Sequence, residues 1–197
     1  MPFIDFVGPD STDPAVRDYY AAVTGEDGNI SNMFPPHAHE PSIFHAWNGL
    51  LGAIREQLDL RRYELATLAA AKELRSSYCM LAHGSVLLEK FYSEEALQAI
   101  LADHHRAGLA AADVALMDFA TKVARDATAI TQADIDAMKT SGHSDREIYL
   151  FSAAAAARSF ITKLVDALGV QPDGKYLAMP ESLRKQLVVG RPIDKPA

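Results

Sequence analysis

The feature that most limits the fold of this chain is a long segment, Arg61–Phe91, that contains no proline and only one glycine, Gly84. Alanine, leucine, glutamate and arginine recur along it, and these residues favour the helical conformation. A single helix of this length would exceed the ~25 residues beyond which an uncapped helix in a globular protein is unusual. We therefore expect a break at Ser76-Ser77, because a serine hydroxyl can accept a hydrogen bond from a first-turn backbone N–H. Two helices are predicted, over 61–75 and 77–91.

The rest of the chain also shows helical spacing, and no window alternates apolar and polar residues as a half-buried strand would. Asp13-Pro14 pairs an N-cap residue with a proline at the first helical position, so a helix begins there and is closed by Gly25. The segments NMFPPHAHEP and DATAIT are expected to be loops. Further helices are expected at 41–59, 94–103, 110–125, 132–139 and 182–187, and a long helix is expected from Asp145, ended by Gly169 at its C′ position. The prediction is an all-α protein.

The length favours one domain over residues 1–197, with an N-terminal helix and loop at 1–29 and an extended C-terminal arm at 171–197. The 19 basic residues are outnumbered by 26 acidic ones, which gives a net charge of −7. No cluster of Lys and Arg supplies the positive surface that nucleic acids require. We expect no nucleic-acid partner.

The compartment is predicted from three further features. Cys79 is the only cysteine and cannot form an intrachain disulfide, so the fold does not rely on an oxidising environment. The first residues, MPFIDFVGPDSTD, lack the basic and apolar segments of a secretory signal. The most apolar run, LFSAAAAA, is much shorter than the ~18 residues of a membrane span. We expect a cytoplasmic protein with no membrane partner.

Cys79 is followed four residues later by His83. If Ser76 or Ser77 caps a helix, Cys79 falls in its first turn, where unpaired N–H groups and the helix dipole favour a negative charge. His83 then lies on the same helical face, within side-chain reach, where an imidazole can take the thiol proton or stabilise the thiolate. Free cysteine is also among the most buried residue types. Spacing alone leaves both interpretations open, a reactive Cys/His pair and a core thiol, and favours the core.

The run RRYELATLAAAKELRSSYCMLAHG resembles the core motif of the carboxymuconolactone decarboxylase superfamily, and within it the alkyl hydroperoxidase D (AhpD-like) branch. That branch carries a Glu, then a Cys-X-X-Cys motif, then a His four residues after the second Cys. Glu64, Cys79 and His83 match the Glu, the second Cys and the His, and Tyr78 matches the aromatic residue or His that commonly precedes this Cys. The likeness extends over about residues 30–170. It implies an AhpD-like helical bundle assembled as a homo-oligomer of two, three or six chains.

Ser76 stands where that branch has its first cysteine. In the two-cysteine members the second thiol attacks a hydroperoxide and becomes a sulfenic acid, which the first thiol converts to a disulfide. A serine hydroxyl cannot form that bond. The resemblance therefore implies a hydroperoxide reductase with a single reactive Cys79, with His83 and Glu64 as proton partners and with an external thiol as reductant.

Two other functions stay open. In a lyase of the carboxymuconolactone decarboxylase kind, His83 or Glu64 would protonate a small lactone acid and Cys79 would be a bystander. Lys72 and Arg75 are the only basic residues near the motif in sequence, which counts against an anionic substrate. A catalytically silent oligomeric protein that retains the fold is the third interpretation. None of these functions requires a cofactor.

Other polar residues carry weaker signals. His37, His39 and His45 with Glu40 could be written as a metal cluster, but their spacing matches no ligand motif, and solvated loop residues are favoured; no metal is expected. Because the resemblance places this segment near the active site, His39, His45 and Trp47 are candidates for substrate contact.

Two further features are assigned structural roles. His104-His105 follows Asp103 at a helix C-terminus, where a positive imidazole is favourable to the helix dipole. Arg158 interrupts the alanine-rich segment SAAAAARSF, and a buried arginine is seldom left unpaired. The small side chains permit close helix approach, so we expect a helix–helix seam there, within the chain or between subunits. Asp118 and Arg125 are expected to be surface or interface charges.

Overall fold

The structure is a computed structural model that describes residues 2–194. Its regular structure consists of nine α-helices and three 3-10 helices, and no strand occurs in these residues. The α-helices are α1 (Pro14–Val23), α2 (Pro41–Arg55), α3 (Leu60–Glu73), α4 (Ser77–Lys90), α5 (Glu94–Asp103), α6 (Ala111–Asp126), α7 (Gln132–Thr140), α8 (Asp145–Ala167) and α9 (Glu181–Leu187). The predicted all-α class is confirmed, and α3 and α4 are separated where the sequence predicts a break.

Both segments predicted to be loops contain 3-10 helices, η1 (Pro35–His39) and η2 (Ala127–Ala129). In η1 two consecutive prolines hold φ near −65°, a value that suits a 3-10 turn. In η2 the Asp126 side chain accepts a hydrogen bond from the backbone N–H of Thr128. The C-terminal arm is not simply extended either, because η3 (Gly174–Ala178) precedes α9.

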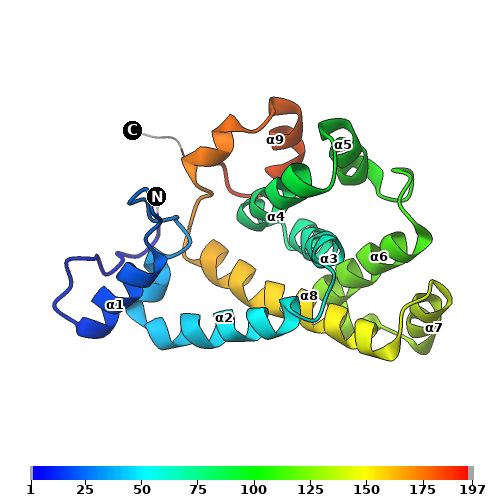
Figure 1. Cartoon of the computed structure of the whole chain (residues 1–197), viewed down its shortest axis with the longest axis horizontal. Coiled ribbons are helices and arrows are strands. Elements are labelled where there is room, and N and C mark those ends of the chain that lie inside the picture. Colours follow the sequence, from blue (N-terminus) through cyan, green and yellow to red (C-terminus); the bar gives the residue numbers. More distant parts are fainter. Residues whose placement is uncertain (1, 195–197) are drawn as a thin grey trace.

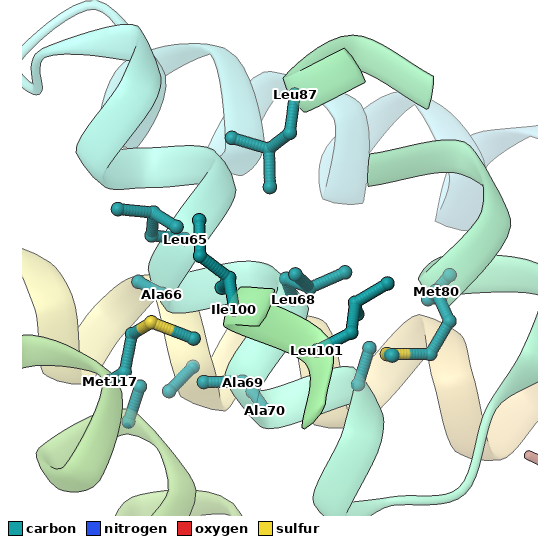
Figure 2. Close-up of a cluster of buried hydrophobic side chains, with 14 of the residues drawn as sticks. Leu65, Ala66, Leu68, Ala69, Ala70, Met80, Leu87, Ile100, Leu101 and Met117 are labelled. Carbon is teal, nitrogen blue, oxygen red and sulfur yellow. The ribbon is translucent and has the colours of Figure 1, made fainter. Parts of the chain in front are cut away.

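α3 is the central helix and packs against α4, α6 and α8 (Figure 1). Every residue from Tyr63 to Ala71 is buried, so this part of α3 has no solvent-facing side. Its alanines keep the helix thin and allow its neighbours to approach closely. Figure 2 shows the surrounding side chains of α4, α5 and α6, which are Met80, Leu87, Ile100, Leu101 and Met117.

A second cluster of buried side chains joins the N-terminal part of the chain to the end of α8. Its aromatic members include Tyr19 of α1, Trp47 of α2 and Tyr78 of α4, and Val165 of α8 packs with them. In Figure 1, α1 and α2 lie at one end of the long axis and α7 at the other. Because Cys79 belongs to the central cluster, the residues on either side of the Tyr78–Cys79 peptide bond lie in different cores.

α8 is 23 residues long, and an 18-residue window within it has a mean hydropathy of 1.3, so by length and composition it could cross a membrane. The run LFSAAAAA is only part of this helix. However, 56% of the window is buried inside the protein, and α8 packs against α2, α3 and α6. α8 is therefore a core helix of the bundle.

Candidate active site

The turn between α3 and α4 places Cys79 at the start of a helix. α3 ends in a Schellman motif, in which the backbone N–H of Ser76 donates to the Ala71 carbonyl and that of Arg75 donates to the Lys72 carbonyl. Arg75 has a φ of 57°, and among residues 2–194 it is the only residue other than glycine with a positive φ. This left-handed residue ends α3 and redirects the chain into α4.

The expectation that a serine hydroxyl caps the second helix is wrong. Ser76 is the N-cap residue of α4, but its side chain makes no capping hydrogen bond. Its buried hydroxyl has no hydrogen-bond partner within residues 2–194, although it lies close enough to the Asp166 carboxyl to oppose the rise in pKa that burial causes there. The Ser77 hydroxyl accepts a hydrogen bond of 2.8 Å from the backbone N–H of Gly190. The first turn of α4 is buried, and the Ser77 hydroxyl serves a tertiary contact instead of a cap.

Cys79 is the third residue of α4 and is only 5% exposed. Its sulfur lies 3.2 Å from the Thr162 hydroxyl and 3.8 Å from a guanidinium nitrogen of Arg158, both on α8. Among the residues that the structure describes, no hydrogen bond joins Cys79 to His83. The two residues share a helical face one turn apart, as predicted, but the polar contacts of the sulfur come from α8.

Arg158 is a buried cation at this site, with 5% of its surface exposed. One terminal nitrogen contacts the Cys79 sulfur, and the other donates to the Tyr63 hydroxyl at 3.3 Å. Its Nε has no hydrogen-bond partner, and no carboxylate within residues 2–194 forms an ion pair with it. The expected seam is confirmed within the chain, but Arg158 itself reaches the candidate cysteine; a seam between subunits stays a prediction.

Glu64 and His83 form the second polar pair of the site, with 2.5 Å between the carboxylate and Nδ1 of the imidazole. Burial lowers the pKa of His83, and the Arg158 guanidinium lowers it further, against the opposing effect of Glu64. The imidazole is therefore neutral near pH 7. With Nδ1–H donated to the carboxylate, Nε2 carries the free lone pair and can accept a proton.

Tyr78 holds the start of α4 against segments from both ends of the chain. Its hydroxyl donates to the Asp173 carboxylate, lies 2.7 Å from the Ser31 hydroxyl and accepts from the backbone N–H of Met33. Burial raises the pKa of Tyr78, and the bond to Asp173 adds to this effect. These contacts give Tyr78 a positioning role, since none of its hydrogen bonds involves Cys79.

The three candidates for substrate contact lie elsewhere. The His39 ring is 3.0 Å from the Asp5 carbonyl, and His45 is exposed on α2. Trp47 is 8% exposed in the second core cluster. His37, expected to be solvated, is 4% exposed, and burial lowers its pKa. None of these residues has a hydrogen bond to Cys79, His83 or Glu64 within the described part of the chain.

Three functional candidates were missed by the sequence interpretation: Arg158, Thr162 and Tyr63. A signal for the first was present, because an arginine in an alanine-rich helix needs a buried partner. Thr162 is four residues later and so lies on the same face of α8. Their meeting with α4 depends on how the two helices cross, which their separate sequences do not reveal.

The structure does not bring His37, His39, His45 and Glu40 together as metal ligands. Within residues 2–194, the group that could hold a metal ion is His104, His105 and Asp118 at the α5–α6 connection. It contains none of the residues around Cys79.

Several solved structures share the fold of this chain, and they include AhpD-like proteins. An alkylhydroperoxidase AhpD core protein from Ralstonia eutropha JMP134, described as peroxidase-related, is 20% identical and has a TM-score of 0.78, over 90% of this chain and 95% of that one. A peroxidase-related protein from Silicibacter sp. TM1040 is 18% identical over the same shares, also with a TM-score of 0.78. The debrominase Bmp8, in complex with 2,3,4-tribromopyrrole, is 12% identical, with a TM-score of 0.68 over 94% and 95%. At these identities the likeness shows the fold, which is AhpD-like.

The sequence between α2 and α6 is similar to one known family. Residues 41–122 match the model of the carboxymuconolactone decarboxylase family. The match contains Glu64, Cys79 and His83. That Ser76 replaces a family cysteine stays a prediction. No curated protein sequence matches the chain.

Proposed function

We propose that this protein is a thiol-dependent hydroperoxide reductase with Cys79 as its nucleophile. The fold does not choose the reaction, because a debrominase shares it. The proposal therefore depends on the residues that surround Cys79.

The observation that carries the proposal is the contact between Arg158 and the Cys79 sulfur. A buried charge is costly unless an opposite charge or several hydrogen bonds compensate it. No carboxylate of the described residues pairs with Arg158, whereas a Cys79 thiolate would do so and would also accept a hydrogen bond from Thr162. The thiolate is the nucleophilic form of cysteine, so the same contact that compensates Arg158 favours reactivity.

The reaction balances with an external thiol. The thiolate attacks the terminal, hydrogen-bearing oxygen of a hydroperoxide, an S–O bond forms, the O–O bond breaks, and Cys79 becomes a sulfenic acid while an alkoxide leaves. A first low-molecular-weight thiol condenses with the sulfenic acid and releases water, and a second displaces Cys79 from the mixed disulfide. Two thiols are oxidised to one disulfide, and the hydroperoxide is reduced to an alcohol and water.

His83 and Glu64 supply the proton transfer. In the neutral state Nε2 of His83 can take the thiol proton, directly or through one water, and the Glu64 carboxylate stabilises the imidazolium that results. The lowered pKa of His83 makes that imidazolium a ready donor to the leaving alkoxide. In this scheme Glu64 acts through His83 and is a positioning residue.

Alkylation by iodoacetamide tests the Arg158 contact, and the adduct reports on Cys79 alone because the chain has no other cysteine. We expect Arg158→Leu to slow alkylation at pH 7 by about tenfold, because the nucleophilic thiolate loses its neighbouring cation. Arg125→Leu is the matched control, since Arg125 is exposed and pairs with Glu73 on the surface. Equal rates in the wild type and Arg158→Leu would contradict the proposal.

Peroxide turnover tests the reaction itself. With a hydroperoxide and a small thiol, we expect the wild type to turn over and Cys79→Ser to be inactive, with one oxygen added to Cys79 when the thiol is omitted. Full peroxide turnover by Cys79→Ser would overturn the proposal. An unreactive thiol in the folded wild type would point to the catalytically silent protein.

One observation favours a second function, a lyase acting on a small lactone acid. Arg158 places a cation close enough to lower the pKa of His83, and Arg55 acts in the same direction. The sequence places few basic residues near the motif, which counts against an anionic substrate. In the structure Arg158 and Arg55 supply positive charge near His83, so the structure counts less against such a substrate. For this function we expect Cys79→Ser to retain lactone turnover and Arg158→Leu to lose it.

The proposed setting is a cytoplasmic homo-oligomer of two, three or six chains, with no nucleic-acid or membrane partner. Low-molecular-weight thiols keep the cytoplasm reducing and would serve as the reductant. Exposed apolar residues support association: Ile43 and Leu50 of α2, and Tyr149 and Phe160 of α8. Light scattering of the purified protein gives the number of subunits.

A further inference from the structure

The connection between α5 and α6 brings three potential metal ligands together. Nε2 of His104 lies 2.8 Å from Oδ1 of Asp118, and Nε2 of His105 lies 3.1 Å from the same oxygen. One ligand atom from each of the three residues lies within 4.8 Å of the others. We propose that His104, His105 and Asp118 form a binding site for a divalent transition metal such as Zn²⁺.

The placement of two consecutive histidines is the first argument. The imidazoles of His104 and His105 converge on one carboxylate oxygen, with their ring centroids 4.4 Å apart and an angle of 35° between their planes. His104 is the C-cap residue of α5, and Asp118 projects from the middle of α6. The ligands therefore come from the C-cap of α5, the turn that follows it and the middle of α6, and a bound ion would link these segments.

The donor atoms determine the class of ion. Two imidazole nitrogens and one carboxylate oxygen suit Zn²⁺, Co²⁺, Ni²⁺ and Cu²⁺, whereas Ca²⁺ and Mg²⁺ prefer oxygen ligands. Tetrahedral zinc with bonds of 2.0–2.1 Å separates its ligand atoms by about 3.3 Å. The distances from the two imidazole Nε2 atoms to Oδ1 of Asp118, 2.8 and 3.1 Å, are a few tenths of an ångström shorter than this separation. A small side-chain rotation would therefore make room for an ion.

The surroundings leave room for additional ligands. The His104 side chain is 21% exposed, and those of His105 and Asp118 are 56% and 48% exposed. An open hollow of about 490 Å³ lies beside the site, and His104 and Asp118 are among the residues that line it. Water can therefore complete the coordination.

The positive charges nearby are engaged with other carboxylates. Lys122 forms an ion pair of 2.7 Å with Asp134, and Arg125 forms one of 2.8 Å with Glu73. Arg106 lies 3.5 Å from the Asp103 carboxylate. These pairings leave the Asp118 carboxylate to the two histidines. The site shares no residue with the one around Cys79 and does not depend on the function proposed above.

Titration of the full chain with Co²⁺ or Zn²⁺ tests the site, in the Cys79→Ser background so that the thiol cannot bind the metal. We expect one ion to bind per chain. Calorimetry and the visible absorption of Co²⁺ measure the binding. We expect His105→Gln and Asp118→Asn each to weaken binding by at least about tenfold. His45→Gln is the matched control, because His45 is an exposed histidine outside the site.

A second readout distinguishes this site from weak surface binding. An ion held by α5 and α6 together should raise the melting temperature of the Cys79→Ser protein and leave that of its Asp118→Asn derivative unchanged. Binding should also weaken in acid, because a protonated imidazole nitrogen cannot bind a metal ion. The proposal is overturned if no ion binds, if Mg²⁺ binds equally well, or if the ligand substitutions leave the affinity unchanged.

Discussion

His83 shows at the residue scale how burial and charge together set the state of one side chain. Glu64 favours its protonated form, but removal from water and the nearby Arg158 guanidinium outweigh that effect and lower the pKa of His83. A neutral imidazole held by a carboxylate is the form that can accept a proton. The same burial also makes the stability of the fold depend on pH.

We expect the free energy of unfolding to decrease as the pH falls below about 6.5, the usual pKa of histidine. Above that value His83 is neutral in both the folded and the unfolded chain, and the stabilising effect is fully present. Below it the unfolded chain takes up a proton that the folded chain does not bind until a lower pH, so stability is lost. His37, whose pKa is also lowered by burial, contributes with the same sign.

Urea denaturation between pH 5 and 8 measures this dependence. His83→Gln, which keeps an N–H donor for Glu64, should flatten the curve between about pH 5 and 6.5. The exposed His45 provides the control, and His45→Gln should leave the curve unchanged. A wild-type curve with no decline in this interval would contradict the assignment of a neutral buried His83.

At the scale of elements, the junction between α3 and α4 depends on the C-terminal arm. The backbone at Gly190 approaches Arg75 so closely that an added Cβ would lie 2.1 Å from the Arg75 carbonyl oxygen. The N–H of Gly190 also donates to the Ser77 hydroxyl. The arm therefore fastens the turn that precedes Cys79, and only a residue without a side chain fits at this position.

Gly190→Ala should lower the free energy of unfolding by about 1–3 kcal/mol, because the backbone must move to relieve the contact. Gly52→Ala is the matched control: it lies in α2 with no atom near an added Cβ, and there alanine should raise stability by about 0.5–1 kcal/mol. Chemical denaturation of both variants measures these effects. Equal changes in the free energy of unfolding for the two variants would show that Gly190 does not need close contact with the α3–α4 junction.

At the scale of the whole molecule, Asp173 connects the two ends of the chain to the central bundle. Its buried carboxylate accepts hydrogen bonds from the Ser31 hydroxyl at 2.6 Å, the backbone N–H of Asn32 at 2.7 Å and the Tyr78 hydroxyl. It follows α8 in the sequence and immediately precedes η3, whose Tyr176 ring lies edge-on to the Tyr78 ring with 6.3 Å between their centroids.

Asp173→Ala removes the acceptor that these three donors share, and we expect it to cost about 3 kcal/mol of stability. We also expect faster alkylation of Cys79 under native conditions, because η3 would detach more readily from the start of α4. Asp194→Ala, at an exposed position of the same C-terminal segment, should change stability by less than about 0.5 kcal/mol. If Asp173→Ala lowers stability but leaves the alkylation rate unchanged, Asp173 does not control access to Cys79.

Much of the helical architecture was predictable from local features. Proline and glycine positions, apolar spacing and capping residues set where the backbone can form helical hydrogen bonds, and these signals are local. Thr131 and Ser144 form capping boxes at the starts of α7 and α8, near the predicted starts. The two 3-10 helices in predicted loops were missed because a single short turn leaves no periodic pattern.

The sequence by itself determined the all-α class, the break between α3 and α4, and the spacing that puts Cys79 and His83 on one face of a helix. Only the tertiary structure decided that Arg158 and Thr162, rather than His83, contact the sulfur, and that Glu64 of α3 reaches His83. The physical reason is that helix formation depends on neighbouring residues. Contacts between helices depend on the angles at which α3, α4 and α8 cross, and these follow from packing the whole core at once.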